Sequence, residues 1–275
     1  MAALKEFLVN LKIEQYYDEL VDDGFDDLDF LKTRSEEQLK IIANDVDMKT
    51  GHQMKFIEAL LDKNTVYPPL PTTTSDTYIG IVVDRSGSMS SIVNDVIGGY
   101  NTFINEQKKL GNAKVSVVRF DDRVEVIHDN VDIHTIPDAT VDTFAPRGST
   151  ALLDSIKYTV DLANKYINSQ TNKPSKVMIV ILTDGEENSS RECTRKDIFE
   201  MIRKHEDKFN WEFIFLAANQ DAIKTGSDMG MKATNCMDFS NEKTPQVFRS
   251  VTEYAKRMRT DNKRGFTDKE RVDCI

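Results

Sequence analysis

The sequence predicts a small all-α domain of five helices, followed by an α/β domain with an open, mainly parallel, doubly wound sheet. Three observations lead to this fold class. Apolar residues recur at helical spacing through residues 1–64. A segment rich in proline and threonine follows at residues 65–76. From Thr77 onward, short β-branched runs alternate with longer helical patterns, the order expected of a parallel sheet with helices on both faces.

The helices of the first region are short and share one apolar core. The first has apolar residues at i, i+3, i+4 and i+7, namely Leu4, Phe7, Leu8 and Leu11. Ser35 and Gln38 form a candidate capping box before a later helix. The last helix is predicted from about Gly51 to Lys63. We therefore expect a compact bundle over residues 1–64.

Residues 65–76 are predicted to be a linker, because Pro68, Pro69 and Pro71 favour an extended, semi-rigid backbone. A docking site for a proline-recognition module is the less favoured alternative. The α/β domain is expected over residues 77–258. Beyond it the sequence turns polar, so residues 259–275 are predicted to be a loose tail.

The α/β domain contains five predicted strands, at residues 78–83, 115–120, 124–127, 177–182 and 211–217. The third alternates in polarity and follows the second after a short turn, so we expect one antiparallel hairpin at the sheet edge. Helices are expected at residues 92–109, 151–167, 194–208 and 245–258.

Oxygen-bearing side chains gather where the predicted strands end. Asp84, Ser86 and Ser88 follow the first strand, and Asp184 follows the strand at 177–182. Thr150 lies in a Gly-Ser-Thr loop just before a helix. Because ligands collect at the carboxyl ends of parallel strands, these five residues are expected to meet. Carboxylates with hydroxyls favour a hard divalent ion, which indicates magnesium, with manganese or calcium as alternatives.

This pattern resembles the metal-ion-dependent adhesion site of von Willebrand factor A (VWA) domains. The resemblance covers residues 77–258 and implies a Rossmann-like sheet. It also implies that Ser86, Ser88 and Thr150 contact the metal directly or in alternation, and that Asp84 and Asp184 bind it directly or through waters. The ion would then take a carboxylate from a protein partner. Within this family, the sequences of the segments LTDGEEN and WEFIFLAANQDA most resemble those of intracellular bacterial-type members.

Several residues near these loops have a competing interpretation. Four acids could share the rim of the site, but a solvated turn is the favoured account of each: Asp121, Asp122, Glu186 and Glu187. Asp154 is expected to interact with a helix dipole rather than with the metal. Three methionines are expected to pack in the core: Met229, Met231 and Met237.

The first domain resembles a sterile alpha motif (SAM) domain. The resemblance is carried by the first-helix leucines, by Tyr16, Tyr17 and Leu28, and by the segment MKTGHQMKF. It implies head-to-tail self-association or docking to another SAM domain. The two surfaces would be an acidic group, Asp22, Asp23, Asp26 and Asp27, and a basic group, Lys49, His52 and Lys55. The alternative is that both are ordinary solvated faces.

Composition excludes several function classes. The net charge is −10, and residues 1–64 hold 8 Lys and Arg against 15 Asp and Glu, so neither part has the basic character that nucleic-acid binding needs. No apolar run approaches the roughly 18 residues that would span a membrane. The start lacks a secretory signal pattern, so we expect a cytoplasmic protein. Cys193, Cys236 and Cys274 are too scattered for a disulfide framework or zinc site.

The sequence therefore predicts a non-enzymatic adaptor that multimerises or docks through its first domain and grips an acidic protein ligand through a cation. One alternative is a scaffold for a different SAM protein, with a structural or regulatory metal site. A metal-dependent phosphoester hydrolase is less favoured, because the aspartyl-nucleophile type needs a second Asp where Ser86 stands. The four histidines are dispersed, and no P-loop or nucleophile-elbow motif is present.

Overall fold

The computed structural model describes residues 2–61, 77–218 and 221–274. The chain divides into two compact units, Met1–Pro71 and Thr72–Ile275. The predicted linker at residues 65–76 lies outside the described residues. Within the described parts of the chain, no helix combines the length and apolar character needed to cross a bilayer.

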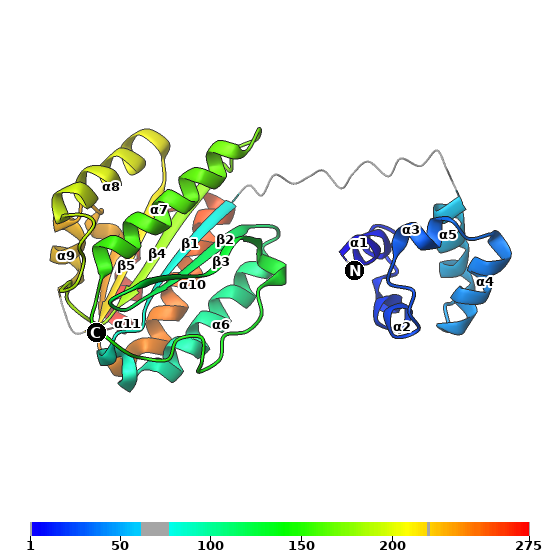
Figure 1. Cartoon of the computed structure of the whole chain (residues 1–275), viewed down its shortest axis with the longest axis horizontal. Helices are drawn as coiled ribbons and strands as arrows, with labels where there is room; N and C mark the ends of the chain where they lie inside the picture. The colour runs from blue at the N-terminus through cyan, green and yellow to red at the C-terminus, as the bar shows by residue number, and fades with distance from the viewer. Residues whose placement is uncertain (1, 62–76, 219–220, 275) are drawn as a thin grey trace. The chain divides into compact units, whose positions relative to one another are not determined.

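The first unit is a cluster of short helices (Figure 1). They are α1 (Ala2–Asn10), α2 (Tyr17–Asp22), α3 (Leu28–Lys32), α4 (Glu36–Asp45) and α5 (Thr50–Leu61). A single 3₁₀ turn at Glu14–Tyr16 precedes α2. Side chains such as Leu8, Leu20 and Phe56 are fully buried between the helices. The capping box predicted at Ser35 and Gln38 is confirmed at the start of α4.

The second unit is built on a six-stranded sheet with the order β3-β2-β1-β4-β5-β6. The strands are β1 (Thr77–Asp84), β2 (Lys114–Phe120), β3 (Val124–Asp132), β4 (Lys176–Thr183), β5 (Glu212–Ala218) and β6 (Cys236–Phe239). The edge strand β3 pairs antiparallel with β2, and the other pairings are parallel. The predicted mainly parallel sheet with one antiparallel edge strand is confirmed.

Helices cover both faces of the sheet (Figure 1). One face carries α6 (Val93–Lys109) and α10 (Thr244–Asp261), and the other carries α7 (Leu152–Ser169) and α8 (Arg195–Phe209). Alternate residues of β1 serve the two cores: Ile79 and Ile81 pack towards α6 and α10, and Tyr78 and Val82 towards α7 and α8. A strand buried on both faces explains the continuous apolar run that marked it in the sequence.

Helices α6 and α10 pack closely against each other at Gly99. A Cβ atom built on Gly99 of α6 would lie 2.1 Å from the ring of Phe248 on α10. The glycine therefore lets the phenylalanine ring lie directly against the α6 backbone.

The carboxyl-terminal part of the chain differs from the prediction. Residues 259–275 were expected to form a loose polar tail, but α10 continues to Asp261 and a further helix, α11 (Asp268–Cys274), follows. Phe266 and Cys274 are buried in the same core as α10, and Arg257 pairs with Glu270 over 2.6 Å. Two apolar side chains and one ion pair are too sparse a pattern to have indicated a folded segment.

Candidate metal centre

The centre lies where β1 and β4 end. These neighbouring strands are parallel, and Val83 of β1 pairs with Leu182 of β4. Asp84 is the last residue of β1 and Asp184 follows the end of β4. The two carboxylates therefore leave the same edge of the sheet, as the positions of the strand ends predicted.

Hydrogen bonds connect the two carboxylates through the loop after β1. The Ser86 backbone N–H donates to Asp84 Oδ1 over 2.6 Å, and the Thr183 hydroxyl donates to Asp84 Oδ2 over 2.5 Å. Ser86 Oγ and Ser88 Oγ are 3.0 Å apart, and the Ser88 hydroxyl donates to Asp184 Oδ1 over 2.6 Å. Hydrogen bonds thus connect Asp84, Ser86, Ser88 and Asp184 in one continuous chain.

Thr150 enters from the loop before α7. Its N–H donates to Asn188 Oδ1 over 2.9 Å, and its carbonyl accepts the Asn188 N–H over 3.1 Å. A Cβ atom built on Gly185 would lie 3.0 Å from Thr150 Oγ1 and 3.6 Å from Ser88 Oγ. The structure therefore brings all five candidate ligands to one edge of the sheet, and the absence of a side chain at position 185 leaves room between them.

The electrostatics of the centre suit a cation. Burial raises the pKa of Asp84 to about 6 against opposing hydrogen bonds from Thr183 and Ser86, and the charge of Asp184 adds to the rise. Burial likewise raises the pKa of Asp184. A positive ion beside these carboxylates would offset the cost of holding them ionised away from water.

The donor set is also the kind that a hard cation prefers. It consists of two carboxylates and three hydroxyls, all of them oxygen ligands. Among the described residues, no group of three or more His, Cys, Asp or Glu side chains is placed to hold a metal ion. A centre at this edge would therefore rely on the hydroxyls of Ser86, Ser88 and Thr150 as much as on the carboxylates.

An ion-pair network lies behind the loop after β1. Arg85, between Asp84 and Ser86, buries its guanidinium, and its Nη2 lies 2.9 Å from both Asp121 Oδ2 and Glu125 Oε1. These are close ion-pair contacts rather than aligned hydrogen bonds. Arg147 reaches the same two acids, with its Nε 2.6 Å from Asp121 Oδ2 and its Nη2 2.7 Å from Glu125 Oε1.

This network corrects the interpretation of Asp121 as part of a solvated turn. Its side chain is fully buried. Burial opposes its ionisation, but hydrogen bonds from Arg147 and the Arg123 N–H, with the charge of Arg85, together hold its pKa below the usual range. The Arg147 N–H also donates to the Arg85 carbonyl over 2.7 Å. Asp121 therefore fastens the loop that carries Ser86 to the loop that carries Thr150.

The other acids near the centre have separate roles. Asp122 and Glu186 are exposed, as expected for a solvated turn. Glu187 accepts the Leu153 N–H over 2.9 Å and so caps α7, which a simple solvated turn would not do. Asp154 lies in the first turn of α7, where it was expected, and its carboxylate also accepts the N–H groups of Arg191 and Glu192. Both carboxylates are thus engaged by backbone N–H groups of neighbouring loops and helices.

The methionine prediction is confirmed, since all three side chains are buried in the two cores of the sheet: Met229, Met231 and Met237. The three cysteines are free.

The sequence reasoning missed four residues that shape the centre. Thr183 holds Asp84, Asn188 holds Thr150, and Arg85 and Arg147 join the loops. Thr183 stands beside Asp184 in the Thr-Asp-Gly motif, so its place in the sequence could have suggested a role. Asn188 and Arg147 gave no such signal, because their partners are distant in the sequence.

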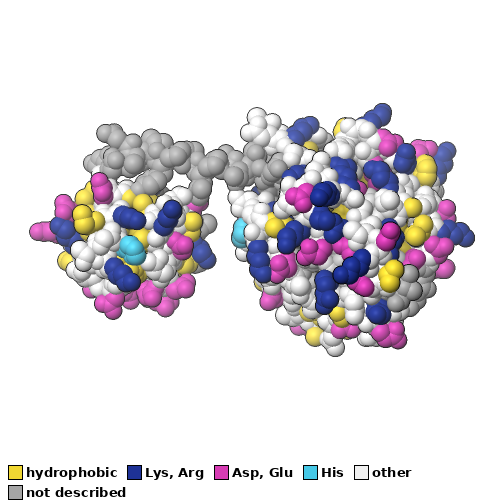
Figure 2. Space-filling view, turned by 180° about the vertical axis from the view of Figure 1, so that it is seen from behind, with side chains coloured by type: hydrophobic (Ala, Val, Ile, Leu, Met, Phe, Trp, Pro, Cys, Tyr) yellow, Lys and Arg dark blue, Asp and Glu magenta, His cyan; other side chains and the backbone are white. Residues whose placement is uncertain are grey.

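The two charged surfaces predicted for the first unit are exposed except at one residue. Asp22, Asp23, Asp26 and Asp27 are exposed, and so are Lys49 and Lys55. His52 is half-buried instead, with its Nδ1 3.1 Å from the Tyr16 hydroxyl. In Figure 2, acidic side chains gather along one edge of the smaller unit, with Lys and Arg side chains on the face beside it.

Comparison with known proteins gives one family-model match, over part of the second unit. Residues 79–187 match the family model for the von Willebrand factor type A domain. This part of the chain is similar to a VWA domain. The match begins in β1 and ends just after Asp184, so it includes every candidate ligand of the VWA domain. A search of curated proteins found no match.

Solved structures resemble this chain at low sequence identity. The vWF domain of the type V pili tip protein Mfa5 from Porphyromonas gingivalis is 8% identical with a TM-score of 0.51, over 71% of this chain and 99% of that one. The ArnB paralog VWA2 from Sulfolobus acidocaldarius and the PilB minor pilin from Streptococcus sanguinis are each 15% identical, with TM-scores of 0.44 and 0.48. The matches cover 66% and 68% of this chain, but only 45% and 62% of those two proteins.

Proposed function

We propose that this chain is a non-enzymatic adaptor whose VWA domain binds an acidic protein ligand through a divalent cation. The observation that carries the proposal is the Ser88–Asp184 hydrogen bond, which links the loops after β1 and β4 into one oxygen-rich centre. The fold is shared with the vWF domain of a pili tip protein, in keeping with a binding role.

Five residues would hold the cation: Asp84, Ser86, Ser88, Thr150 and Asp184. Magnesium suits this set of oxygen donors best, with manganese or calcium as alternatives. When bound, the cation supplies a Lewis-acidic position that can accept a carboxylate from the partner. The residues of the chain orient that position: Thr183 and the Ser86 N–H fix the Asp84 carboxylate, and Asn188 fixes Thr150.

The first unit would act as a SAM-like module that self-associates or docks to another SAM domain. Its acidic group, Asp22, Asp23, Asp26 and Asp27, would meet a basic group formed by Lys49, His52 and Lys55. The exposure of the four aspartates supports this arrangement. In the basic group, His52 is half-buried against Tyr16, so Lys49 and Lys55 are the exposed members. Clustering would raise the effective concentration of VWA domains and strengthen weak metal-dependent contacts.

A second candidate function follows from the burial of Asp84. Its side chain is 1% exposed, and both carboxylate oxygens already accept hydrogen bonds from Ser86 and Thr183. This favours an alternative in which the cation is structural or regulatory and the SAM-like module binds a different SAM protein. A metal-dependent phosphoester hydrolase is a weaker alternative, since Ser86 stands where that chemistry would need a second aspartate.

The test is magnesium titration by calorimetry of the intact chain, of an Asp84→Ala variant and of an Asp95→Ala control at an exposed position on α6. We expect binding in the wild type and the control and its loss in Asp84→Ala, with the fold retained by circular dichroism. Equal binding in all three would exclude this centre as the cation site. Analytical sedimentation at high protein concentration tests the proposed self-association of the first unit. A chain that stays monomeric would contradict it.

A further inference from the structure

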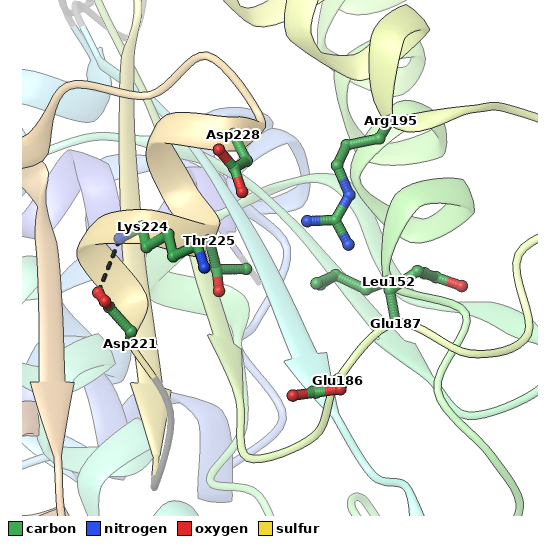
Figure 3. Close-up of a pocket in the computed structure, with 8 residues that line it drawn as sticks. All are labelled: Leu152, Glu186, Glu187, Arg195, Asp221, Lys224, Thr225 and Asp228. Carbon is green, nitrogen blue, oxygen red and sulfur yellow. Dashed lines mark hydrogen bonds between the residues drawn. The ribbon is translucent and has the colours of Figure 1, made fainter.

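A pocket of about 370 Å³ adjoins the candidate metal centre (Figure 3). Its lining includes Leu152, two residues after Thr150, and Glu186, two residues after Asp184. The opposite wall is formed by Arg195 at the start of α8 and by α9 (Ala222–Asp228). Two loops therefore contribute both to the metal centre and to this pocket, so one bound segment could occupy both.

The pocket is strongly charged and carries a negative excess. Four carboxylates and two cationic groups line it: Glu186, Glu187, Asp221, Asp228, Arg195 and Lys224. Glu187 caps α7, and Asp221 caps α9 by accepting the Lys224 N–H over 2.8 Å. The formal charge of this lining is −2, and a positive group that entered the pocket would reduce it.

The remaining charged side chains are available to a ligand. Glu186, Arg195, Lys224 and Asp228 are exposed, and none of these side chains has a hydrogen bond or ion pair to another residue in the described part of the chain. In Figure 3, Arg195 and Asp228 point into the same space from α8 and α9, with Glu186 across from them. Charges of both signs thus line one space without neutralising each other.

We infer that this pocket receives a basic side chain, Lys or Arg, from the same protein ligand whose carboxylate binds the cation. The inference rests on the proposed function. The pocket is at the small end of the range for ligand sites, which suits a single side chain. Glu186 and Asp228 would pair with the ligand cation, while Arg195 and Lys224 would donate hydrogen bonds to peptide carbonyls of the same segment. The preferred ligand then carries an acid and a base close together in sequence.

The test uses short fluorescent peptides with one central Asp in a Gly-Ser background, titrated with the intact chain in magnesium and again with chelator. Lys, Ser or Glu is placed at each of the positions flanking the Asp. We expect magnesium-dependent binding of the Ser peptide, and binding about tenfold tighter with Lys than with Glu at the favoured position. The preference should shrink as salt is raised, because exposed charges are screened.

Two matched double variants test whether the preference for Lys over Glu arises in this pocket. The double variant Glu186→Gln with Asp228→Asn should bind the Ser peptide as the wild type does and lose the preference for Lys. The control Glu200→Gln with Asp207→Asn makes the same charge change at exposed positions of α8 and should keep it. A preference for Glu, equal binding of Lys and Glu peptides, or a preference that survives in the pocket variant would overturn the inference while leaving the proposed function intact. If no peptide binds in a magnesium-dependent way, the proposed function itself fails and the inference fails with it.

Discussion

The Ser88 hydroxyl donates a hydrogen bond to the Asp184 carboxylate over 2.6 Å, although the two residues are 96 positions apart in the sequence. Parallel pairing of β1 with β4 places their loops side by side and makes this contact possible. Ser88 Oγ also lies 3.0 Å from Ser86 Oγ. One exposed hydroxyl therefore connects the Asp84 side of the candidate centre to the Asp184 side.

This relationship leads to a prediction for Ser88→Ala, which removes the hydroxyl and changes no charge. Ser88 is a proposed ligand that also donates a hydrogen bond to Asp184, so loss of its hydroxyl should weaken magnesium binding by about tenfold or more. Calorimetric titration measures the affinity, and thermal unfolding checks the fold. Ser90→Ala is the control, because Ser90 is exposed in the same 3₁₀ turn. Equal affinities of the two variants would mean that Ser88 is not part of a cation site.

The Asp121 network predicts a stability effect that is independent of any metal. Asp121→Asn keeps the shape of the side chain but removes its negative charge. The Arg85 guanidinium, only 4% exposed, then loses the fully buried carboxylate with which it pairs. Breaking one partner of a buried ion pair costs about 3 kcal/mol. Urea unfolding should show this loss, whereas Asp142→Asn at an exposed position should change the free energy of unfolding by less than about 0.5 kcal/mol. A loss equally small in both variants would show that Glu125 alone satisfies Arg85.

Sequence reasoning predicted most of the sheet because β1 and β4 are buried on both faces and appear as continuous apolar runs. It brought the five candidate ligands together because strand ends and hydroxyl-rich turns are visible in the sequence. It did not find β6, which has only four residues, or α11, whose buried contacts are few.

The support of the centre was also not predictable from the sequence. Asp121 stands in a run, Asp121-Asp122-Arg123, that is typical of a solvated turn. Its partner Arg147 lies 26 positions away. Asp84 at the end of β1 pairs with Phe120 at the end of β2. Only this register brings Asp121, the next residue of the chain, into contact with Arg85. Periodicity identifies which face is buried, but it does not say which charged residues meet behind a loop.

Two adjacent glycines of α6 give a matched pair of predictions. Gly99→Ala would place a methyl group 2.1 Å from the Phe248 ring, so α6 and α10 must separate or the ring must move. We expect a loss of about 1–3 kcal/mol in the free energy of unfolding. Gly98→Ala meets no atom within 4 Å, so the better helix propensity of alanine should stabilise the domain by up to about 1 kcal/mol. Chemical unfolding of both variants should give opposite signs, and two changes of the same sign would contradict this packing.

The last prediction concerns the pH dependence of stability through His205. Its ring is buried against Trp211, with centroids 4.5 Å apart. Nδ1 donates to the Met201 carbonyl over 2.7 Å, which leaves Nε2 to accept from Asn164 Nδ2 over 3.1 Å. Burial lowers the pKa of His205 and outweighs the Met201 hydrogen bond; the charge of Lys204 lowers it further and that of Asp161 raises it.

Because the native pKa is lowered, the unfolded chain binds a proton at about pH 6.5 that the native chain does not. The contribution of His205 to the free energy of unfolding should therefore fall as pH drops below about 6.5, by up to about 1.4 kcal/mol per pH unit, until the native imidazole is also protonated. Burial lowers the pKa of His128 as well, so it contributes in the same direction. Urea unfolding of the wild type and of His205→Gln from neutral to mildly acidic pH separates the two contributions. The variant should lose part of the slope, and an unchanged slope would mean that His205 is protonated as readily in the native state as in the unfolded chain.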